Sequence, residues 1–345
     1  MFKIKNMVLI IVILFISGCS DSSNPFSNIE DETSNSYTFI ACEGSFTDSN
    51  NNGSLYILNE SGVIEVLEGL GDGVQSVEVY QDQLYVLINN SQKILIYDIS
   101  ENGIVFVSEI LTDGQSPREI VFVDNKAYFT TWDSDYNVYP TIPGFVKVLN
   151  LSSGLIEASI EVGIMPEDLL FDGFNMWIAN SGESTVSKID LLNNVVLENY
   201  EVGNGPVELT ILNDEIYIAR TYYDESWNSF FGSSKINNNG SIVINEYGTG
   251  LPCGGSVMNY QNAVYRTYSG GIAPLMEDLN VDALNKIGDF EESLLYHAEI
   301  INNLIWFGLT DFSDENAVKV LNSTGEEVIS FSTSSPPGDF AYWNK

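Results

Sequence analysis

The stretch that decides the fold spans residues 163–202 and reads GIMPEDLLFDGFNMWIANSGESTVSKIDLLNNVVLENYEV. Alternating apolar and polar residues, rich in Val, Ile and aromatic side chains, predict β-strands. We expect four of them, at 167–171, 176–179, 185–189 and 195–202, joined by turns that contain Gly, Asn and Asp. Four antiparallel strands in about 40 residues are typical of one blade of a β-propeller.

The opening of this stretch recurs along the chain. A Gly is followed three residues later by a Pro, and eleven residues after the Pro comes an aromatic residue. The copies are Gly114, Pro117, Tyr128; Gly163, Pro166, Trp177; Gly203, Pro206, Tyr217; and, more loosely, Gly71, Val74, Tyr85. Self-similarity with a period near 40 residues predicts a repeat architecture.

Seven units can be counted on this basis. They span residues 37–70, 71–112, 113–162, 163–202, 203–249, 250–290 and 291–333. The first unit lacks its innermost strand, and Pro337–Tyr342 near the C-terminus matches Pro166–Phe171. We therefore predict an all-β, seven-bladed propeller of four-stranded antiparallel blades over residues 37–345, in which the C-terminal strand completes blade one and closes the ring.

The chain resembles the YVTN-type propellers, including propeller lipoproteins of Gram-negative bacteria whose domain is of unknown function. The resemblance covers residues 37–342 and rests on the Gly-x-x-Pro pairs, on Ile189-Asp190 and Tyr97-Asp98, and on Glu43-Gly44-Ser45-Phe46. Family members usually carry Asn before that Glu-Gly pair, where this chain has Cys42. The resemblance implies a binding or scaffold protein and no catalytic residues.

The first residues have the features of a bacterial secretion signal. A basic start precedes an apolar stretch over residues 7–16, which is shorter than the roughly 20 residues of a membrane span. Ile16-Ser17-Gly18-Cys19 resembles a lipobox, which implies removal of residues 1–18 and lipidation of Cys19. An uncleaved membrane anchor is the alternative. Residues 19–36 are rich in Ser, Asn, Asp and Glu, and predict a flexible tether.

The expected location follows from the lipid anchor. Acyl chains on Cys19 would hold the protein stably on a bilayer. By resemblance to lipoprotein sorting, Ser20 after the lipidated residue favours the outer membrane over the inner one. We expect an outer-membrane lipoprotein, and the periplasmic face and the cell surface both stay open. An outer-membrane transporter is a candidate partner.

The composition excludes some classes of partner. The chain carries 48 acidic against 13 basic residues, a net charge of −35. This balance argues against binding to nucleic acid, whose phosphates require Lys and Arg, and against adhesion to anionic lipid head groups. Beyond Cys19 there are only Cys42 and Cys253, which do not make a disulfide framework, and a single bridge between them stays open.

Aromatic side chains gather in loops that should share one rim of the propeller. The loops between the second and third strands of blades three and five are long and aromatic, whereas the others are mostly short. Exposed aromatic loops are typical of binding surfaces. Our candidate ligand-binding residues there are Trp132, Tyr136, Tyr139, Tyr222, Tyr223, Trp227, Phe230 and Tyr268.

The three arginines of the chain, Arg118, Arg220 and Arg266, map to the same rim. Guanidinium groups gathered at one mouth of an acidic protein indicate recognition of a carboxylate, phosphate or amide group. The alternative is that each arginine pairs with a nearby Asp or Glu. We include all three among the candidate ligand-binding residues.

Neither catalysis nor a metal site finds much support in the sequence. His297 is the only histidine and lies in an expected inner strand, where a lone His is more often a core residue. Asp48, Asn50 and Asn52 match the first half of a calcium loop, but Asn59 stands where the loop needs Glu, and a polar turn looks the same. We expect no catalytic residues and no cofactor.

The sequence thus predicts a non-catalytic, lipid-anchored envelope propeller that binds a small ligand or a partner protein on its aromatic rim. Two alternatives remain. One is an interaction scaffold without a small-molecule pocket. The other is a metal-dependent propeller lactonase or lyase that uses the central channel.

Overall fold

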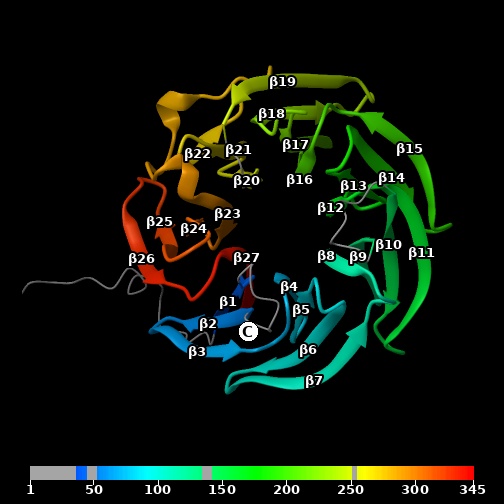
Figure 1. The fold of residues 1–345 in the computed structure, drawn as a ribbon, viewed down its shortest axis with the longest axis vertical. Coiled ribbons are helices and arrows are strands. Elements are labelled where there is room, and N and C mark those ends of the chain that lie inside the picture. Colours follow the sequence, from blue (N-terminus) through cyan, green and yellow to red (C-terminus); the bar gives the residue numbers. More distant parts are fainter. Residues whose placement is uncertain (1–35, 45–52, 134–141, 251–254) are drawn as a thin grey trace, which may run out of the picture. The chain divides into compact units, whose positions relative to one another are not determined.

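The computed structural model describes residues 36–44, 53–133, 142–250 and 255–345. They form β-strands and two short 3-10 turns, η1 (Ala283–Asn285) and η2 (Glu292–Leu294). The strands form seven sheets arranged as a ring of blades (Figure 1), which confirms the predicted all-β propeller. Within the described part of the chain, no helix is long and apolar enough to span a membrane.

The blades follow the repeat units in order, each running from an inner strand at the channel to an outer strand. Blade one contains β27 (Pro337–Asn344), β1 (Ser36–Cys42), β2 (Ser54–Asn59) and β3 (Gly62–Glu68). Blade two contains β4 (Val74–Tyr80), β5 (Gln83–Ile88), β6 (Lys93–Ser100) and β7 (Gly103–Leu111). Blade three contains β8 (Ser116–Val123), β9 (Lys126–Trp132), β10 (Pro143–Asn150) and β11 (Leu155–Ile164).

The remaining four blades continue the ring. Blade four contains β12 (Pro166–Phe171), β13 (Asn175–Asn180), β14 (Thr185–Asp190) and β15 (Val195–Glu201). Blade five contains β16 (Pro206–Leu212), β17 (Glu215–Tyr223), β18 (Ser229–Ile236) and β19 (Ile242–Thr249). Blade six contains β20 (Val257–Tyr260), β21 (Ala263–Tyr268) and β22 (Gly271–Pro274). Blade seven contains β23 (Leu295–Ile301), β24 (Leu304–Thr310), β25 (Asn316–Leu321) and β26 (Glu327–Ser332).

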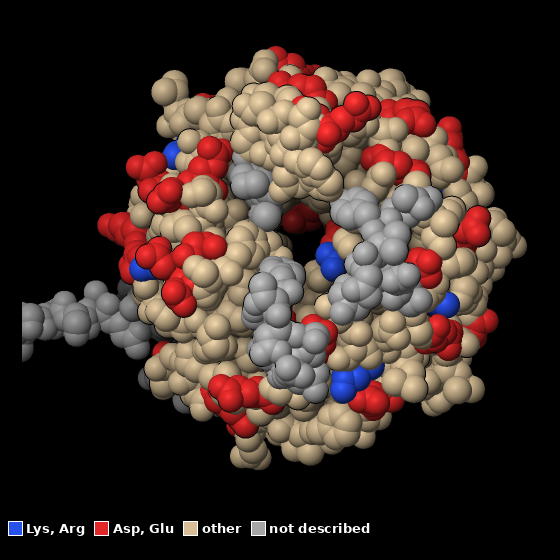
Figure 2. All heavy atoms as spheres, in the orientation of Figure 1, with Lys and Arg blue, Asp and Glu red and all other residues tan. Residues whose placement is uncertain are grey.

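Blade six is the most irregular of the seven. Its described sheet holds three strands, and single bridges from Ile272 to Ile287 and from Leu275 to Val281 attach the following segment to β22. That segment contains the turn η1 instead of a regular outer strand. The inner strands of all seven blades surround a hollow at the centre of the ring (Figures 1 and 2).

The ring is closed by the two ends of the described chain. β27 pairs antiparallel with β1, from Ser36 opposite Asn344 to Cys42 opposite Pro337. The pairing confirms that the C-terminal strand completes blade one. The ring of Trp343 stacks on Tyr37 with centroids 5.6 Å apart, and its Nε1 donates to Asp82 Oδ1 at 2.9 Å.

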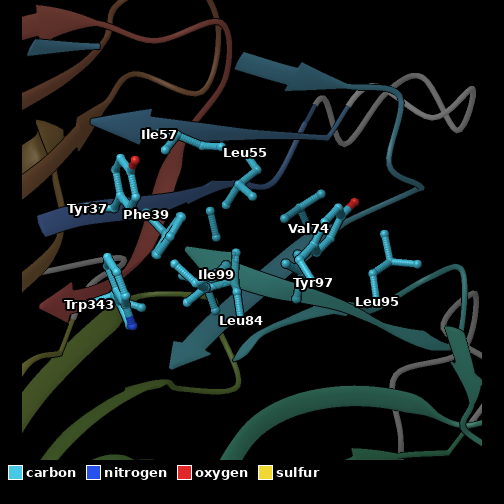
Figure 3. Packing of buried hydrophobic residues seen from close by; sticks show 14 of the residues in the cluster. Tyr37, Phe39, Leu55, Ile57, Val74, Leu84, Leu95, Tyr97, Ile99 and Trp343 are labelled. Carbon is cyan, nitrogen blue, oxygen red and sulfur yellow. The ribbon is translucent and has the colours of Figure 1, made fainter. Parts of the chain in front are cut away.

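Apolar side chains fill the space between neighbouring blades. Figure 3 shows the cluster between blades one and two, in which Phe39, Leu55, Val74 and Leu84 are fully buried beside Trp343. Alternation along each strand supplies these side chains, since every second residue of a strand faces the adjacent sheet. The closing strand β27 therefore contributes to the core as well as to the ladder.

The Gly of the repeat has a packing role in blade five. Gly203 has φ +86°, a backbone conformation that favours glycine, and an added Cβ would lie 2.6 Å from Nη1 of the buried Arg220. The repeated glycine thus leaves room for the guanidinium at this blade.

We predict that Phe340→Ala destabilises the protein by about 3–4 kcal/mol, because truncating a buried Phe leaves a cavity. Phe340 is 2% exposed and packs against His297 and Trp306, with ring centroids 5.6 and 5.9 Å away. Phe174→Ala is the matched control, since Phe174 is 85% exposed in a turn and its loss should change the free energy of unfolding by less than about 0.5 kcal/mol. Urea unfolding measures both, and similar values would contradict the role given to β27.

Candidate functional site

The inner strands enclose a cavity of about 800 Å³ that opens at the centre of the ring, and Figure 2 shows acidic side chains inside this hollow. Its wall combines aromatic and acidic side chains. The aromatic ones are Trp132, Tyr222, Tyr223, Trp227 and Tyr296, and the acidic ones are Glu43, Glu119, Glu167, Asp168, Glu183, Glu208, Asp224, Glu299 and Asp339. Arg118 and His297 complete the charged and titratable groups of the wall.

A β-bulge in the inner strands explains why so many polar side chains face the channel. Register shifts follow the Pro position in β8, β12, β16 and β27, and the equivalent point in β4 and β23. A bulge re-aims side chains, so that two successive residues can point to the same side. Glu167 and Asp168 of β12 line the cavity together, as do Tyr296 and His297 of β23.

The second residue after the Pro position forms a ring around the channel, one residue from each blade. This inner ring consists of Asp339, Ser76, Glu119, Asp168, Glu208, Ser256 and His297 in blade order. Asp339 Oδ2 accepts from the N–H of Val77 at 2.7 Å, and Asp168 Oδ2 accepts from that of Leu209 at 2.6 Å. Each bond joins one blade to the next, so the carboxylates support the ring as well as lining the cavity.

Burial shifts the titration of this group of acids. It raises the pKa of Asp168 to about 6 and raises those of Glu119, Glu208 and Asp339 well above their usual range. Near the ring, burial also raises the pKa of Glu43, and it raises the pKa of Glu299 to about 8. The cavity therefore favours protons or other cations.

Arg118 reaches the cavity, but its guanidinium is already engaged. Its Nε donates to Glu167 Oε1 at 3.0 Å, and Nη2 forms an ion pair with the same carboxylate. Nη1 donates to Gln75 Oε1 at 2.5 Å, and the guanidinium carbon lies 4.1 Å from the ring centroid of Trp132. These contacts neutralise the charge that we expected to bind an anionic ligand.

Arg220 and Arg266 are not part of the cavity wall. Both are fully buried. Arg220 forms an ion pair with Glu246, and Arg266 donates to Gly232 O and to Ser233 Oγ, the latter at 2.9 Å. Arg220 thus pairs with a nearby acid, as the alternative expected, whereas the two bonds named for Arg266 go to a carbonyl and a hydroxyl group of blade five.

Some of the aromatic candidates line the cavity and others do not. Trp227 and Tyr223 are 73% and 45% exposed at the cavity, with ring centroids 6.1 Å apart. Phe230 and Tyr268 are not part of the cavity wall. Phe230 stacks on Tyr222 at 5.6 Å, while Tyr268 packs against Phe231 at 6.3 Å.

Other candidates lie outside the described residues: Tyr136, Tyr139, Asp48, Asn50, Asn52 and Cys253. Cys42 is buried in β1, and burial raises the pKa of its thiol to about 12. Its burial beside the closing strand gives this position a place in the core.

Sequence reasoning misjudged His297 and did not single out the inner-ring acids. His297 is a wall residue of the cavity, whereas a core position was expected. Burial lowers its pKa. The missed signal was the repeat itself, since aligning the units on their Pro places Glu119, Asp168, Glu208 and Asp339 at one equivalent position.

The fold is similar to those of solved structures. One is a functionally unknown protein from Desulfotomaculum acetoxidans DSM 771, 12% identical, with TM-score 0.65 over 89% of this chain and 98% of that one. The computationally designed Ika8 protein is 10% identical, with TM-score 0.59 over 87% and 89%. A protein of unknown function from Bacteroides caccae is 11% identical, with TM-score 0.52 over 89% and 98%. These similarities show the fold alone. No protein-family model and no curated protein matches the sequence.

We predict that the stability of the metal-free protein falls as pH rises from 5 to 8. Between the unfolded pKa of 3.8 and the folded value of about 6, the folded state retains the Asp168 proton that the unfolded chain has released, so the free energy of unfolding decreases. Between pH 5 and 8 Asp168 alone contributes on the order of 1 kcal/mol to this decrease, most of it below about pH 6. The raised pKa values of the other cavity acids also lower the free energy of unfolding as pH rises. The lowered pKa of His297 has the opposite effect, but it is one group against several.

Urea unfolding in EDTA at pH 5 and pH 8 measures this decrease in the free energy of unfolding. Glu208→Gln keeps an oxygen that can accept from Val257 N, now at 3.1 Å, and should remove part of the decrease. Glu65→Gln, on the exposed face of outer strand β3, is the matched control and should leave the decrease unchanged. A stability that is constant or rises between pH 5 and 8 would be inconsistent with buried, proton-retaining carboxyls.

Proposed function

We propose that the protein is a non-catalytic binding propeller that takes a small ligand into the central cavity through the aromatic mouth formed by Trp227 and Tyr223. The observation that carries the proposal is the composition of the cavity wall, where exposed aromatic rings lead to a group of carboxyl groups. A pocket of this volume is suited to a small molecule.

The wall also indicates which ligand chemistry fits. A positively charged ligand favours the ionised form of these carboxyl groups, which then only accept hydrogen bonds, so the wall suits a ligand that supplies donors such as ammonium and hydroxyl groups. The one arginine of the wall is paired with Glu167, which leaves little positive charge for an anion. Aromatic rings bind the apolar face of a ligand or a cation above the ring. A ligand with both features, such as an amino sugar or another amine, matches the cavity better than a carboxylate or a phosphate.

We also propose that the propeller is a lipoprotein of the YVTN type, anchored in the outer membrane through acyl chains on Cys19. The lipobox-like Ile16-Ser17-Gly18-Cys19 supports this part of the proposal. Anchoring near the membrane suits capture of a ligand for an outer-membrane transporter, which is the partner that we propose.

Replacing Trp227 by Ala should weaken ligand binding at least tenfold, which corresponds to about 1.4 kcal/mol. Tri-glucosamine is the probe, with tri-galacturonic acid as the anionic comparison, and quenching of Trp fluorescence together with calorimetry reports binding. Phe174→Ala, which removes an exposed aromatic ring outside the cavity wall, should bind as the wild type does. Preferential binding of the anionic trisaccharide, or equal effects of the two variants, would contradict the proposed cavity chemistry.

Replacing Cys19 by Ala should release the protein from the membrane fraction, because no thiol remains for the lipid anchor. Metabolic labelling with a fatty-acid analogue and fractionation of cells measure the change, and Cys42→Ala is the matched control. Retention of label in Cys19→Ala would show that the anchor lies elsewhere.

A further inference from the structure

Three potential metal ligands converge at the junction of blades seven and one. His297 and Glu299 lie two residues apart on β23, and Asp339 lies on the closing strand β27. His297 Nε2 is 3.8 Å from Glu299 Oε2 and 4.0 Å from Asp339 Oδ1. One donor atom from each residue lies within 4.8 Å of the other two. All three residues belong to the cavity wall.

The hydrogen bonds around Ser256 assign the tautomer of His297. Ser256 Oγ accepts from the N–H of Ala298 at 3.1 Å and donates to the carboxylate of Glu208. When the ionised carboxylate of Glu208 takes this only proton, Ser256 Oγ can only accept from His297 Nδ1, 3.4 Å away. The neutral imidazole then carries its proton on Nδ1, and Nε2 presents a lone pair to the two carboxylates.

The two carboxylates are held by their other contacts. Asp339 accepts from Val77 N through Oδ2, which leaves Oδ1 toward the histidine, and Glu299 accepts from the backbone N–H of Phe340. His297 Nε2 and Glu299 Oε2 are both shielded from solvent and have no hydrogen-bond partner among the described residues. Three polar atoms thus face one another in a site shielded from solvent, and they require either a proton held between them or a cation in its place.

We propose that His297 Nε2, Glu299 Oε2 and Asp339 Oδ1 bind one divalent transition-metal ion, of the Zn²⁺ or Mn²⁺ class. Tetrahedral zinc with bonds near 2.1 Å places its ligand atoms roughly 3.4 Å apart, so the two carboxylate oxygens must approach His297 Nε2 from 3.8 and 4.0 Å, and each other from within 4.8 Å, to bind one ion.

The donor set favours this class of ion over calcium or magnesium. Imidazole suits zinc and its neighbours in the first transition row, whereas calcium and magnesium prefer oxygen ligands alone. Ser256 acts as the partner of the other ring nitrogen, as is usual for metal-binding histidines. Three protein ligands leave at least one coordination position for water or for an oxygen of a molecule in the cavity.

Titration of the purified full chain with Zn²⁺ and Mn²⁺, after removal of metal with EDTA, tests the proposal by calorimetry. One ion should bind per chain. Glu299→Gln keeps the size of the side chain and an acceptor for Phe340 N but removes the charge, and His297→Ala removes the nitrogen ligand. Each should weaken binding at least tenfold. Bound Co²⁺ should give visible absorption bands that change in His297→Ala, which reports directly on nitrogen ligation.

Glu119→Gln is the matched control, because it removes a carboxyl from the same inner ring but outside the three ligands. Its affinity should stay within twofold of the wild type. Equal weakening by Glu119→Gln and Glu299→Gln would overturn the proposal in favour of diffuse attraction to the acidic cavity. So would unchanged Co²⁺ bands in His297→Ala, equal affinity for Ca²⁺, or no binding. Circular dichroism checks that the variants fold. If His297→Ala does not fold, the metal affinity of Glu299→Gln alone tests the proposal.

Discussion

The pairing of β27 with β1 is the constraint on which the rest of the structure depends. A ring of separate sheets has no covalent closure, and its ends would part if the first and last blades met only through side chains. Here one sheet contains both ends of the described chain. Closure holds the inner strands of all blades around a common axis, and residues from seven distant segments thereby meet in one cavity.

The cavity acids have two opposing effects, because their hydrogen bonds connect the blades while their charges repel one another. As hydrogen-bond acceptors, Asp168 and Asp339 connect neighbouring blades through the backbone N–H groups of Leu209 and Val77. As charges, they lie close to other carboxyls in a partly desolvated space, which disfavours ionisation. The bulged inner strands impose this crowding, because they direct successive polar residues toward the axis. A cavity built in this way attracts positive charge by its construction.

The sequence was sufficient for the fold because the repeat is local and periodic. The phrase from Gly163 to Trp177 predicted a blade, and the match between residues 337–342 and 166–171 predicted the closing strand. The site was less accessible. Arg220 was a candidate ligand-binding residue, but its burial beside Glu246 depends on how blade five packs, which no local pattern reveals. His297 was expected in the core, and only the bulge in β23 explains why it faces the cavity.

Closure by the last strand also has a consequence for how the chain folds. Tyr37 and Trp343 are neighbours in space but come from opposite ends of the described sequence, so blade one depends on contacts of very high sequence separation. Such contacts form slowly, because the entropy of ordering the intervening chain must be offset first. During synthesis, β1 keeps an unpaired inner edge until β27 has been made. The unpaired edge of β1 can therefore aggregate with other strand edges throughout the synthesis of the intervening blades. A nonsense codon before residue 337 would remove the strand that closes the ring, so the product would be an open propeller and not a shorter closed one.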